Sequence, residues 1–299
     1  MPLASAVYRK PVRRGKSLCR LFVCIIGIGL GGCATTGGWQ LASDDRPVKV
    51  LVLESPLTID PGRLQKVVTP DNKTQLSLTD APLADASAHA QAYALTTMQS
   101  ALGRQPNLAV VSSPAQATRL LDSVREHDMN TGLTQREADQ LQQITGADAV
   151  LKFSISDYGL TPTAWRNGYI TFEVTTTLGL AAIIAYSGST VAKAAAGAYL
   201  VQEAIEETAE AYAGFWALDV VCRPVRIEAE LIKLQPVSTV WEYHDTGLSD
   251  VRLARMTSTV TEEERIDQLD QATGKAIDDI VATLANALND TRPRRLSRR

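Results

Sequence analysis

Strand-like and helical patterns alternate from residue 48 to about residue 290, and this alternation restricts the possible folds more than any other feature of the sequence. Residues 48–53 are mostly β-branched or aliphatic and end at Ser55-Pro56, as in a buried central strand. Residues 83–103 then place small and apolar side chains on one side of a helix. A helix with one such side is buried by packing on a sheet, so the order of elements predicts an α/β sandwich.

The remaining elements extend this pattern. The segment after Pro114 suits a helix, because the amide hydrogen that proline lacks has no partner in a first helical turn. Thr134 and Thr261 each precede a glutamate by three residues, the spacing of a capping box, and these helices are expected to end near Gly146 and Asn289. We therefore expect a mixed sheet with flanking helices and a C-terminal helix. Its strands are expected at residues 48–53, 108–112, 147–156, 169–177, 227–234 and 238–244.

The first 32 residues have the layout of a secretory signal peptide. They carry six basic residues and no acidic one, followed by an apolar core at residues 21–30 and small residues before Cys33. A membrane-spanning helix needs about 20 apolar residues, so this core is too short to span a bilayer. The pair Arg13-Arg14 is not followed by the apolar consensus of a twin-arginine signal, which favours ordinary signal-peptide charge.

The end of this segment, Leu30-Gly31-Gly32-Cys33, resembles the lipobox of bacterial lipoprotein precursors. The resemblance implies cleavage between Gly32 and Cys33 and a covalent lipid on the Cys33 thiol, with no other cofactor. Because Ala34 rather than aspartate follows the cysteine, it also implies anchoring in the outer membrane, on the periplasmic face. We expect four parts: a signal peptide at 1–32, a tether at 33–47, one α/β domain at 48–290 and an Arg-rich disordered tail at 291–299.

The charge of the chain changes when residues 1–32 are removed. What remains has 24 basic and 33 acidic residues, and five of the basic residues are arginines within residues 291–299. The body before them has only 19 basic residues, so we expect no nucleic-acid partner. The arginines are expected to be solvated, and the alternative is contact with anionic lipid or lipopolysaccharide phosphate.

Cysteine and histidine positions give little support to a metal site. With Cys19 and Cys24 in the signal peptide and Cys33 acylated, Cys222 is the one remaining thiol, and we expect it buried in a strand. Intermolecular disulfide formation or reactivity of this thiol is the alternative. The three histidines are scattered without metal-ligand spacing, so no metal is expected.

Three segments carry a resemblance to known envelope proteins. Residues 146–151 (GADAVL), 226–232 (RIEAELI) and 240–242 (VWE) are similar to the pattern of CsgG-type lipoproteins and the amino-terminal domain of TolB. This resemblance, over about residues 48–288, implies a periplasmic α/β domain of anticodon-binding-like topology. It also implies a role in envelope assembly, export or cell-wall synthesis. Residues 235–239 (QPVST) replace the Thr-Gly turn usual in that group.

An Ala-rich insertion at about residues 178–215 is predicted to form a helical hairpin. Residues 174–192 carry no charge, but threonines, serines and glycines weaken them as a membrane span. The hairpin has three possible roles: packing on its own sheet, self-association or partner docking, and insertion into a bilayer. The small residues that would make the contact in the second role are Ala194, Ala195, Ala198 and Val201.

No catalytic motif appears in the sequence, which lacks a nucleophile elbow, a phosphate-binding loop and a metalloprotease motif. Asp122, Glu126, His127 and Asp128 are interpreted as a mixed-charge helix end, and His244-Asp245 as a turn rather than a mutually oriented pair. Glu228 and Glu230 alternate onto one strand face, which we expect to face solvent or a partner.

These patterns favour a non-enzymatic accessory lipoprotein that binds a protein partner or itself. No small-molecule substrate is indicated. The alternative is a subunit of an oligomeric CsgG-type secretion channel, and a periplasmic hydrolase is a more remote one.

Overall fold

The computed structural model describes residues 46–57, 59, 80–127, 129, 131–169, 171, 215, 219, 221–251 and 260–290. The chain divides into two units, 1–32 and 33–299, and every described residue belongs to the second. The predicted cleavage and lipidation site at Gly32 and Cys33, the residues of the insertion that would make its contacts, and the Arg-rich tail all lie outside the described residues.

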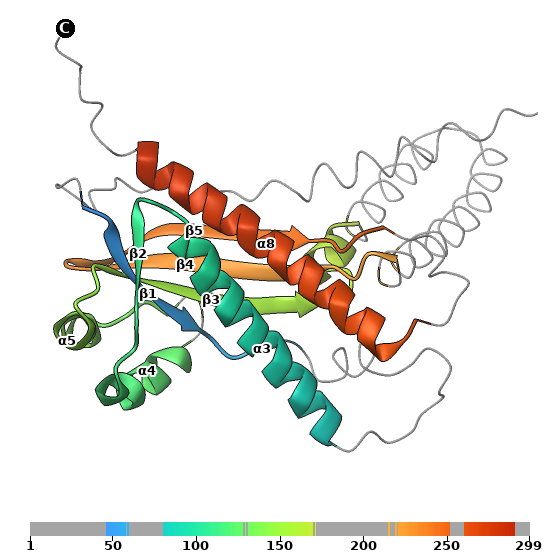
Figure 1. The fold of residues 1–299 in the computed structure, drawn as a ribbon, viewed down its shortest axis with the longest axis horizontal. Coiled ribbons are helices and arrows are strands. Elements are labelled where there is room, and N and C mark those ends of the chain that lie inside the picture. Colours follow the sequence, from blue (N-terminus) through green and yellow to red (C-terminus); the bar gives the residue numbers. More distant parts are fainter. Residues whose placement is uncertain are drawn as a thin grey trace, which may run out of the picture. The chain divides into compact units, whose positions relative to one another are not determined.

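Five strands form one mixed sheet in the order β2-β1-β3-β4-β5, which confirms the predicted α/β fold (Figure 1). Strand β1 runs parallel to β2 and β3, whereas β4 runs antiparallel to β3 and β5. The elements in chain order are β1 (Val48–Glu54), α3 (Asp80–Gly103), β2 (Leu108–Val111), the 3-10 helix η1 (Ala115–Ala117), α4 (Thr118–Arg125), α5 (Gln135–Thr145), β3 (Ala149–Tyr158), β4 (Val225–Leu234), β5 (Val237–Gly247) and α8 (Glu262–Asp290).

Helices cover the two faces of the sheet unequally. The long helices α3 and α8 lie side by side on one face, where Leu151, Phe153 and Trp241 join their apolar residues in the larger core. The short helices α4 and α5 pack on the other face, against Leu51, Leu53 and Val150. The two cores follow from strand geometry, because successive side chains of a strand point to opposite faces.

The predicted helix ends are confirmed where the structure describes them. Thr134 and Glu137 form a reciprocal capping box at the start of α5, and Gly146 ends that helix in the left-handed conformation at φ 65°. At the start of α8, the Thr261 amide donates to Glu264 at 3.1 Å and the Glu264 amide donates to Thr261 Oγ1 at 3.2 Å. The large apolar side chains of α8 from Leu269 to Leu288 are buried, whereas Ile266 in its first turns is 39 % exposed.

Several local predictions are wrong. Tyr169 and Thr171 are helical, so the strand expected at 169–177 does not begin there. Pro114 is extended and precedes η1 rather than sitting in a first helical turn. Cys222 is buried, as expected, but it lies in a turn before β4 rather than in a strand. The backbone carbonyl of Cys222 accepts a hydrogen bond from the Ser249 amide, which belongs to no strand, so Cys222 does not extend the ladder of β4.

Strand β5 approaches α8 very closely at Gly247. A Cβ atom at this position would overlap the carbonyl oxygen of Ala272 and lie 2.7 Å from the Ala276 nitrogen. Ala272 and Ala276 are fully buried, so small residues on both elements make this contact possible.

Asn107, which is 4 % exposed, contacts both the start of β1 and the end of α8. The backbone carbonyl of Asn107 accepts from the Val48 amide at 3.0 Å, where β1 begins. Its amide group donates to Ala285 O at 3.4 Å and to Asn289 Oδ1 at 3.3 Å, in the last turns of α8. Figure 1 accordingly shows the start of β1 and the end of α8 at the same end of the sheet.

Candidate functional site

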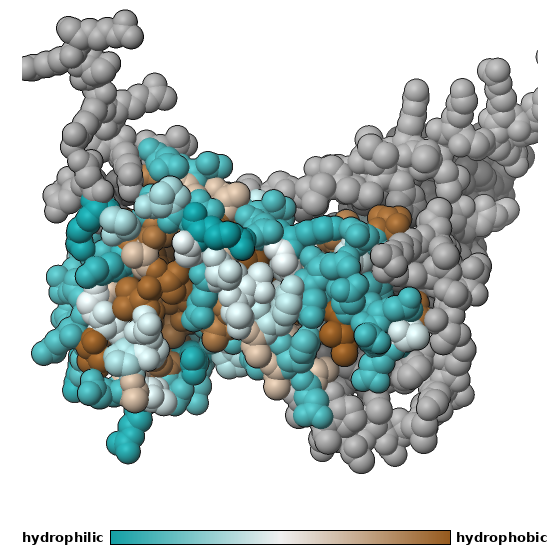
Figure 2. Space-filling model, viewed as in Figure 1, coloured by the Kyte–Doolittle hydropathy of each residue, from teal (hydrophilic) through white to brown (hydrophobic). Residues whose placement is uncertain are grey.

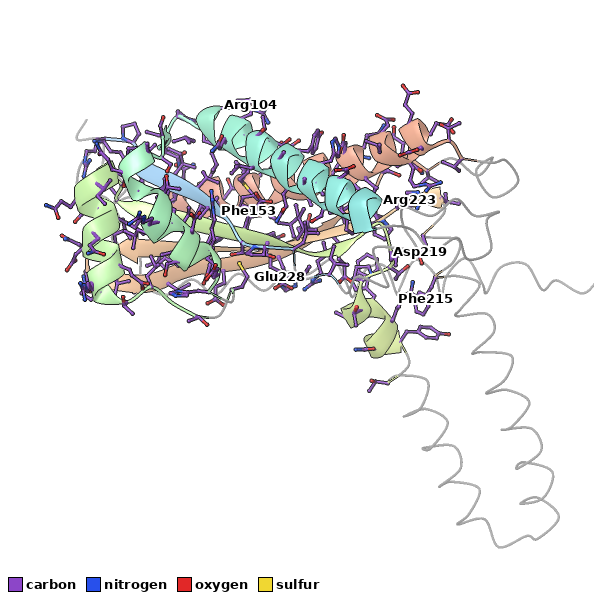
Figure 3. All side chains as sticks on the ribbon, turned by 90° about the horizontal axis from the view of Figure 1, so that it is seen from below. Arg104, Phe153, Phe215, Asp219, Arg223 and Glu228 are labelled. Atoms are coloured by element: carbon purple, nitrogen blue, oxygen red, sulfur yellow. The ribbon has the colours of Figure 1, made fainter. Side chains whose placement is uncertain are left out.

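A polar face occupies the part of β3, β4 and β5 that points away from α3 and α8. In the sheet register Lys152 lies opposite Glu230, which lies opposite Glu242. The next row of the same face is formed by Ser154, Glu228 and His244. Phe153 and Glu228 lie on opposite sides of the sheet in Figure 3. This face, with Ser156 and Arg226 beside those rows, is the strongest candidate for a binding surface among the described residues.

One end of the polar face is buried and charged. Lys152 is 1 % exposed and its ammonium donates to the carbonyl of His127 at 2.7 Å, at the end of α4. Glu230 is 4 % exposed, and one of its carboxyl oxygens has no hydrogen-bond partner among the described residues. Burial raises the pKa of Glu230 to about 7, against the attraction of Lys152 and with added repulsion from Glu242. We expected the face of Glu228 and Glu230 to meet solvent or a partner, and this is wrong at Glu230, which is buried within the protein.

A second carboxylate, half-buried, lies near this end at Glu54, the last residue of β1. Burial raises the pKa of Glu54 to about 7, and the charge of Arg125 opposes that shift. Arg125 is the last residue of α4. A carboxyl group with a pKa of about 7 gains or loses its proton near neutral pH, so the charges of Glu54 and Glu230 change in that range.

The other end of the polar face is partly exposed, at Glu228 and His244, while Ser154 in the same row is buried. The Glu228 side chain is 42 % exposed and accepts a bond from Arg226 Nε at 3.4 Å. Burial, and then the charge of Arg226, lower the pKa of His244, while Glu228 raises it. A neutral histidine beside an arginine and a glutamate offers a donor, an acceptor and both charges to a bound partner.

His244 and Asp245 lie within β5 rather than in the predicted turn. They point to opposite faces because they are consecutive strand residues, so neither orients the other. Asp245 is instead influenced by Asp279 of α8, and burial followed by that neighbour's charge raises its pKa to about 6. At the end of α4, Asp122 pairs with Arg125 at 3.3 Å, as the interpretation of a mixed-charge helix end predicts.

The charge state of Glu230 should be visible in stability. In the folded protein the pKa of Glu230 is raised from 4.5 to about 7. The folded state therefore holds this proton more tightly than the unfolded state, so the resulting stabilisation is complete below pH 4.5 and is lost as the pH rises to 7. Glu230→Gln keeps the neutral form at all pH values. We expect equal stability near pH 4 and a gain of about 1–2 kcal/mol at pH 8, measured by urea unfolding. The exposed control Glu263→Gln should show no such divergence, and a pH-independent difference for Glu230→Gln would contradict this assignment.

A second polar cluster, here called the neck, consists of Thr161, Arg166, Phe215 and Asp219. Its residues come from the two chain segments that flank the insertion. Asp219 accepts from the Thr161 backbone amide, from Thr161 Oγ1 at 2.6 Å and from Arg166 Nη2 at 2.6 Å. Arg166 Nε donates to the Thr161 carbonyl at 3.1 Å, and its guanidinium lies 5.2 Å from the centroid of the Phe215 ring. Figure 3 shows Phe215 and Asp219 together at this end of the sheet.

The neck is fixed to the sheet through β3. Asp157, near the end of β3, accepts from the Thr163 amide at 3.3 Å and thereby holds the start of the helix at 163–169. A bulge between Ile155 and Asp157 brings Asp157 opposite Arg226 of β4. The same strand that carries Lys152 and Ser154 therefore positions the neck.

Sequence reasoning missed the neck and the buried lysine. A signal for Lys152 existed, because a charged residue interrupts an otherwise apolar strand start. For Asp219 there was none, since its partners Thr161 and Arg166 are more than fifty residues away in the chain.

Metal-binding and membrane-spanning features form the last group of candidate sites. The described residues contain no group of three His, Cys, Asp or Glu side chains that could hold a metal ion. The three histidines have separate neighbours: His89 lies 3.1 Å from Asp270, His127 lies 3.8 Å from Glu137, and His244 lies on the polar face. Of the helices described, none combines the length and the apolarity that crossing a bilayer requires.

The likenesses to solved structures described here are distant. No known family and no curated protein matches the sequence. Among solved structures, a PelC dodecamer from Paraburkholderia phytofirmans is 12 % identical with a TM-score of 0.34, covering 85 % of this chain and 98 % of that one. The hypothetical protein CT253 from Chlamydia trachomatis is 8 % identical with a TM-score of 0.39, covering 81 % and 98 %.

Proposed function

We propose that the protein is an outer-membrane lipoprotein, anchored through Cys33 and facing the periplasm. Its domain, of the CsgG and TolB amino-terminal type, would be a non-catalytic accessory factor in envelope assembly, export or cell-wall synthesis. The observation that carries the proposal is Leu30-Gly31-Gly32-Cys33, placed directly after a basic segment and a short apolar core. Residues 34–45 then separate the lipid site from the first described residue, Arg46.

The polar face supports a binding role for this domain. It presents Arg226, Glu228, Glu242 and His244 from strands that a large core holds rigid on their other side. The charges that this face exposes are the carboxylates of Glu228 and Glu242, which fit the recognition of a basic protein surface. Such a surface needs no reacting group.

Replacement of the anchor cysteine tests the proposal. With Cys33→Ala we expect processing to stop and the lipid to be absent, measured by radiolabelled fatty-acid incorporation. The processed form should disappear from the outer-membrane fraction. Cys222→Ala is the matched control, because that thiol is 5 % exposed and should leave anchoring unchanged. If the Cys33→Ala protein is still processed and still sediments with the outer membrane, the lipid-anchor proposal fails.

One observation favours self-assembly, and with it the second candidate function, a subunit of an oligomeric secretion channel. Strand β2 is an edge strand of the described sheet, and its residues Ala109, Val110 and Val111 are only half-buried. Figure 2 shows hydrophobic side chains gathered over this region of the molecule. An apolar edge strand is a template for pairing with another chain. Light scattering of the detergent-extracted protein decides the matter: a discrete large ring supports a channel, and a monomer or dimer excludes it.

A further inference from the structure

A group of polar side chains is buried beside the first turns of α8, where the chain enters β4. Its members are Arg223, Ser249, Arg265 and Gln268, which are 4 %, 2 %, 4 % and 0 % exposed. Arg223 Nε donates to Gln268 Oε1 at 3.1 Å, so the start of β4 is joined to α8. Arg265 lies three residues before Gln268, on the same side of the helix. These four residues, here called the arginine cluster, lie apart from the polar face, which points away from α8.

Backbone contacts hold Ser249 in the arginine cluster. The Ser249 amide donates to the Cys222 carbonyl at 2.8 Å, directly before Arg223 in the chain. The amide of the next residue, Asp250, donates to Gln271 Oε1 at 3.4 Å. Residues 249–250 are therefore fixed between residue 222 and α8. Figure 3 shows Arg223 at the same end of the molecule as Asp219.

Two donors of the arginine cluster point to a ligand. Gln268 Nε2 and Ser249 Oγ are fully buried, and neither has a hydrogen-bond partner among the described residues. Because the amide oxygen of Gln268 accepts from Arg223, the nitrogen Nε2 is left as a donor. Buried donors in proteins normally have an acceptor, since burial removes the hydrogen bonds they made with water. The two groups therefore require an acceptor that is not among the described residues.

The arginines determine the charge of this acceptor. A guanidinium group has five N–H donors and no acceptor, so Arg223 and Arg265 can bind a ligand while they also contact other groups of the chain. Both keep their positive charge at every physiological pH. The arginine cluster thus offers a buried ligand two positive charges and neutral donors from an amide and a hydroxyl group.

The backbone at Arg223 is unusual in a way that agrees with a binding role. Its φ is 37°, in the left-handed region that residues with a side chain seldom adopt. Pro224 follows, and a proline restricts the residue before it still further. Such costly conformations recur where a side chain is held in place for a ligand. Here the conformation accompanies the placement of the Arg223 side chain against α8.

We propose that the arginine cluster binds a phosphate group, with Arg223, Arg265, Gln268 and Ser249 as the donors. Guanidinium groups match the spacing of phosphate oxygens and form paired hydrogen bonds with them. Four donor side chains suit the four oxygens of phosphate better than the two oxygens of a carboxylate. Because the arginine cluster is almost fully buried, the ligand is inorganic phosphate or the terminal phosphate of a small ester. This inference does not depend on the proposed lipid anchor.

The test uses the processed full-length protein in detergent, equilibrated in phosphate-free buffer. Inorganic phosphate, glycerol phosphate and acetate are titrated at constant ionic strength, and calorimetry gives the stoichiometry and the Kd. Thermal unfolding provides a second readout, because a ligand of the folded state raises the Tm. Ser249→Ala and Arg265→Gln are compared with Arg119→Gln, which removes an exposed arginine from α4.

We expect one phosphate per chain. Arg265→Gln should raise the Kd about tenfold or more and Ser249→Ala about fivefold, because a charged and a neutral donor are lost, while Arg119→Gln should leave it unchanged. In phosphate-free buffer Ser249→Ala should have the Tm of the wild type or a higher one, since it removes a buried hydroxyl that lacks a partner. Phosphate should then raise its Tm less than that of the wild type. This comparison decides the matter even where Arg265→Gln fails to fold.

The three ligands separate the remaining outcomes. Tighter binding of glycerol phosphate assigns the site to a phosphate ester, and tighter binding of inorganic phosphate assigns it to the free ion. Acetate that binds as tightly as phosphate overturns the inference. It is also overturned by the absence of saturable binding, or by a Kd that Ser249→Ala leaves unchanged, because a group of the chain itself or water then meets these donors.

Discussion

Gly247→Ala is expected to destabilise the protein by about 3 kcal/mol or more, measured as the free energy of unfolding in urea. The added methyl group would overlap the Ala272 carbonyl and crowd the Ala276 nitrogen, and both are backbone atoms of α8. A flexible side chain could turn away from such a clash. The backbone of a helix packed along β4 and β5 cannot yield without moving the whole contact between α8 and the sheet.

A glycine of the same helix supplies the control. Gly274 lies inside α8, and the nearest atom to a Cβ placed there is the Tyr93 hydroxyl at 3.8 Å, an ordinary contact. Gly274→Ala should therefore stabilise the protein by up to about 1 kcal/mol, since alanine is the better helix former. Opposite signs at the two positions are expected, and a neutral effect at Gly247 would show that β5 and α8 do not approach as described.

Asp219→Ala should cost about 3 kcal/mol of unfolding free energy. The change removes the acceptor for the amide and the hydroxyl of Thr161 and leaves the partly buried Arg166 without its carboxylate. Asp219→Asn should lie between the wild type and the alanine variant, because an amide oxygen still accepts from Thr161 but carries no charge for Arg166.

The surface pair Arg104–Asp278 gives the comparison for this prediction. Its side chains are 64 % and 63 % exposed, against 29 % and 15 % for Arg166 and Asp219. Asp278→Ala should therefore cost less than about 1 kcal/mol, because solvent screens exposed ion pairs. Similar costs for the two variants would mean that the neck adds no more stability than an ordinary surface contact.

Most of the sheet and its long helices could be predicted, because the responsible signals are local. Apolar runs located β1 and β3, and the Thr–Glu spacings located the starts of α5 and α8. The error at 169–177 has a physical cause: Thr, Val and Tyr have high strand propensity, but Tyr169 lies on a helix whose start is fixed by Asp157 and Thr163.

The candidate site was only partly predictable. Alternation correctly placed Glu228 and Glu230 on one face, but it could not tell that Lys152 and the end of α4 would bury one of them. Pairing in the sheet brings Lys152 opposite Glu230 from nearly eighty residues away, and no local pattern encodes such a contact. The neck is missed for the same reason, since Asp219 and Arg166 meet only when the chain between them returns.

Strand β3 also works as a spacer. Its ten residues extend about 30 Å, from the end that holds Asn107 to the end that carries the neck. The described positions that flank residues 172–214, Tyr169 and Phe215, therefore lie about 30 Å from the end of the sheet at which β1 begins.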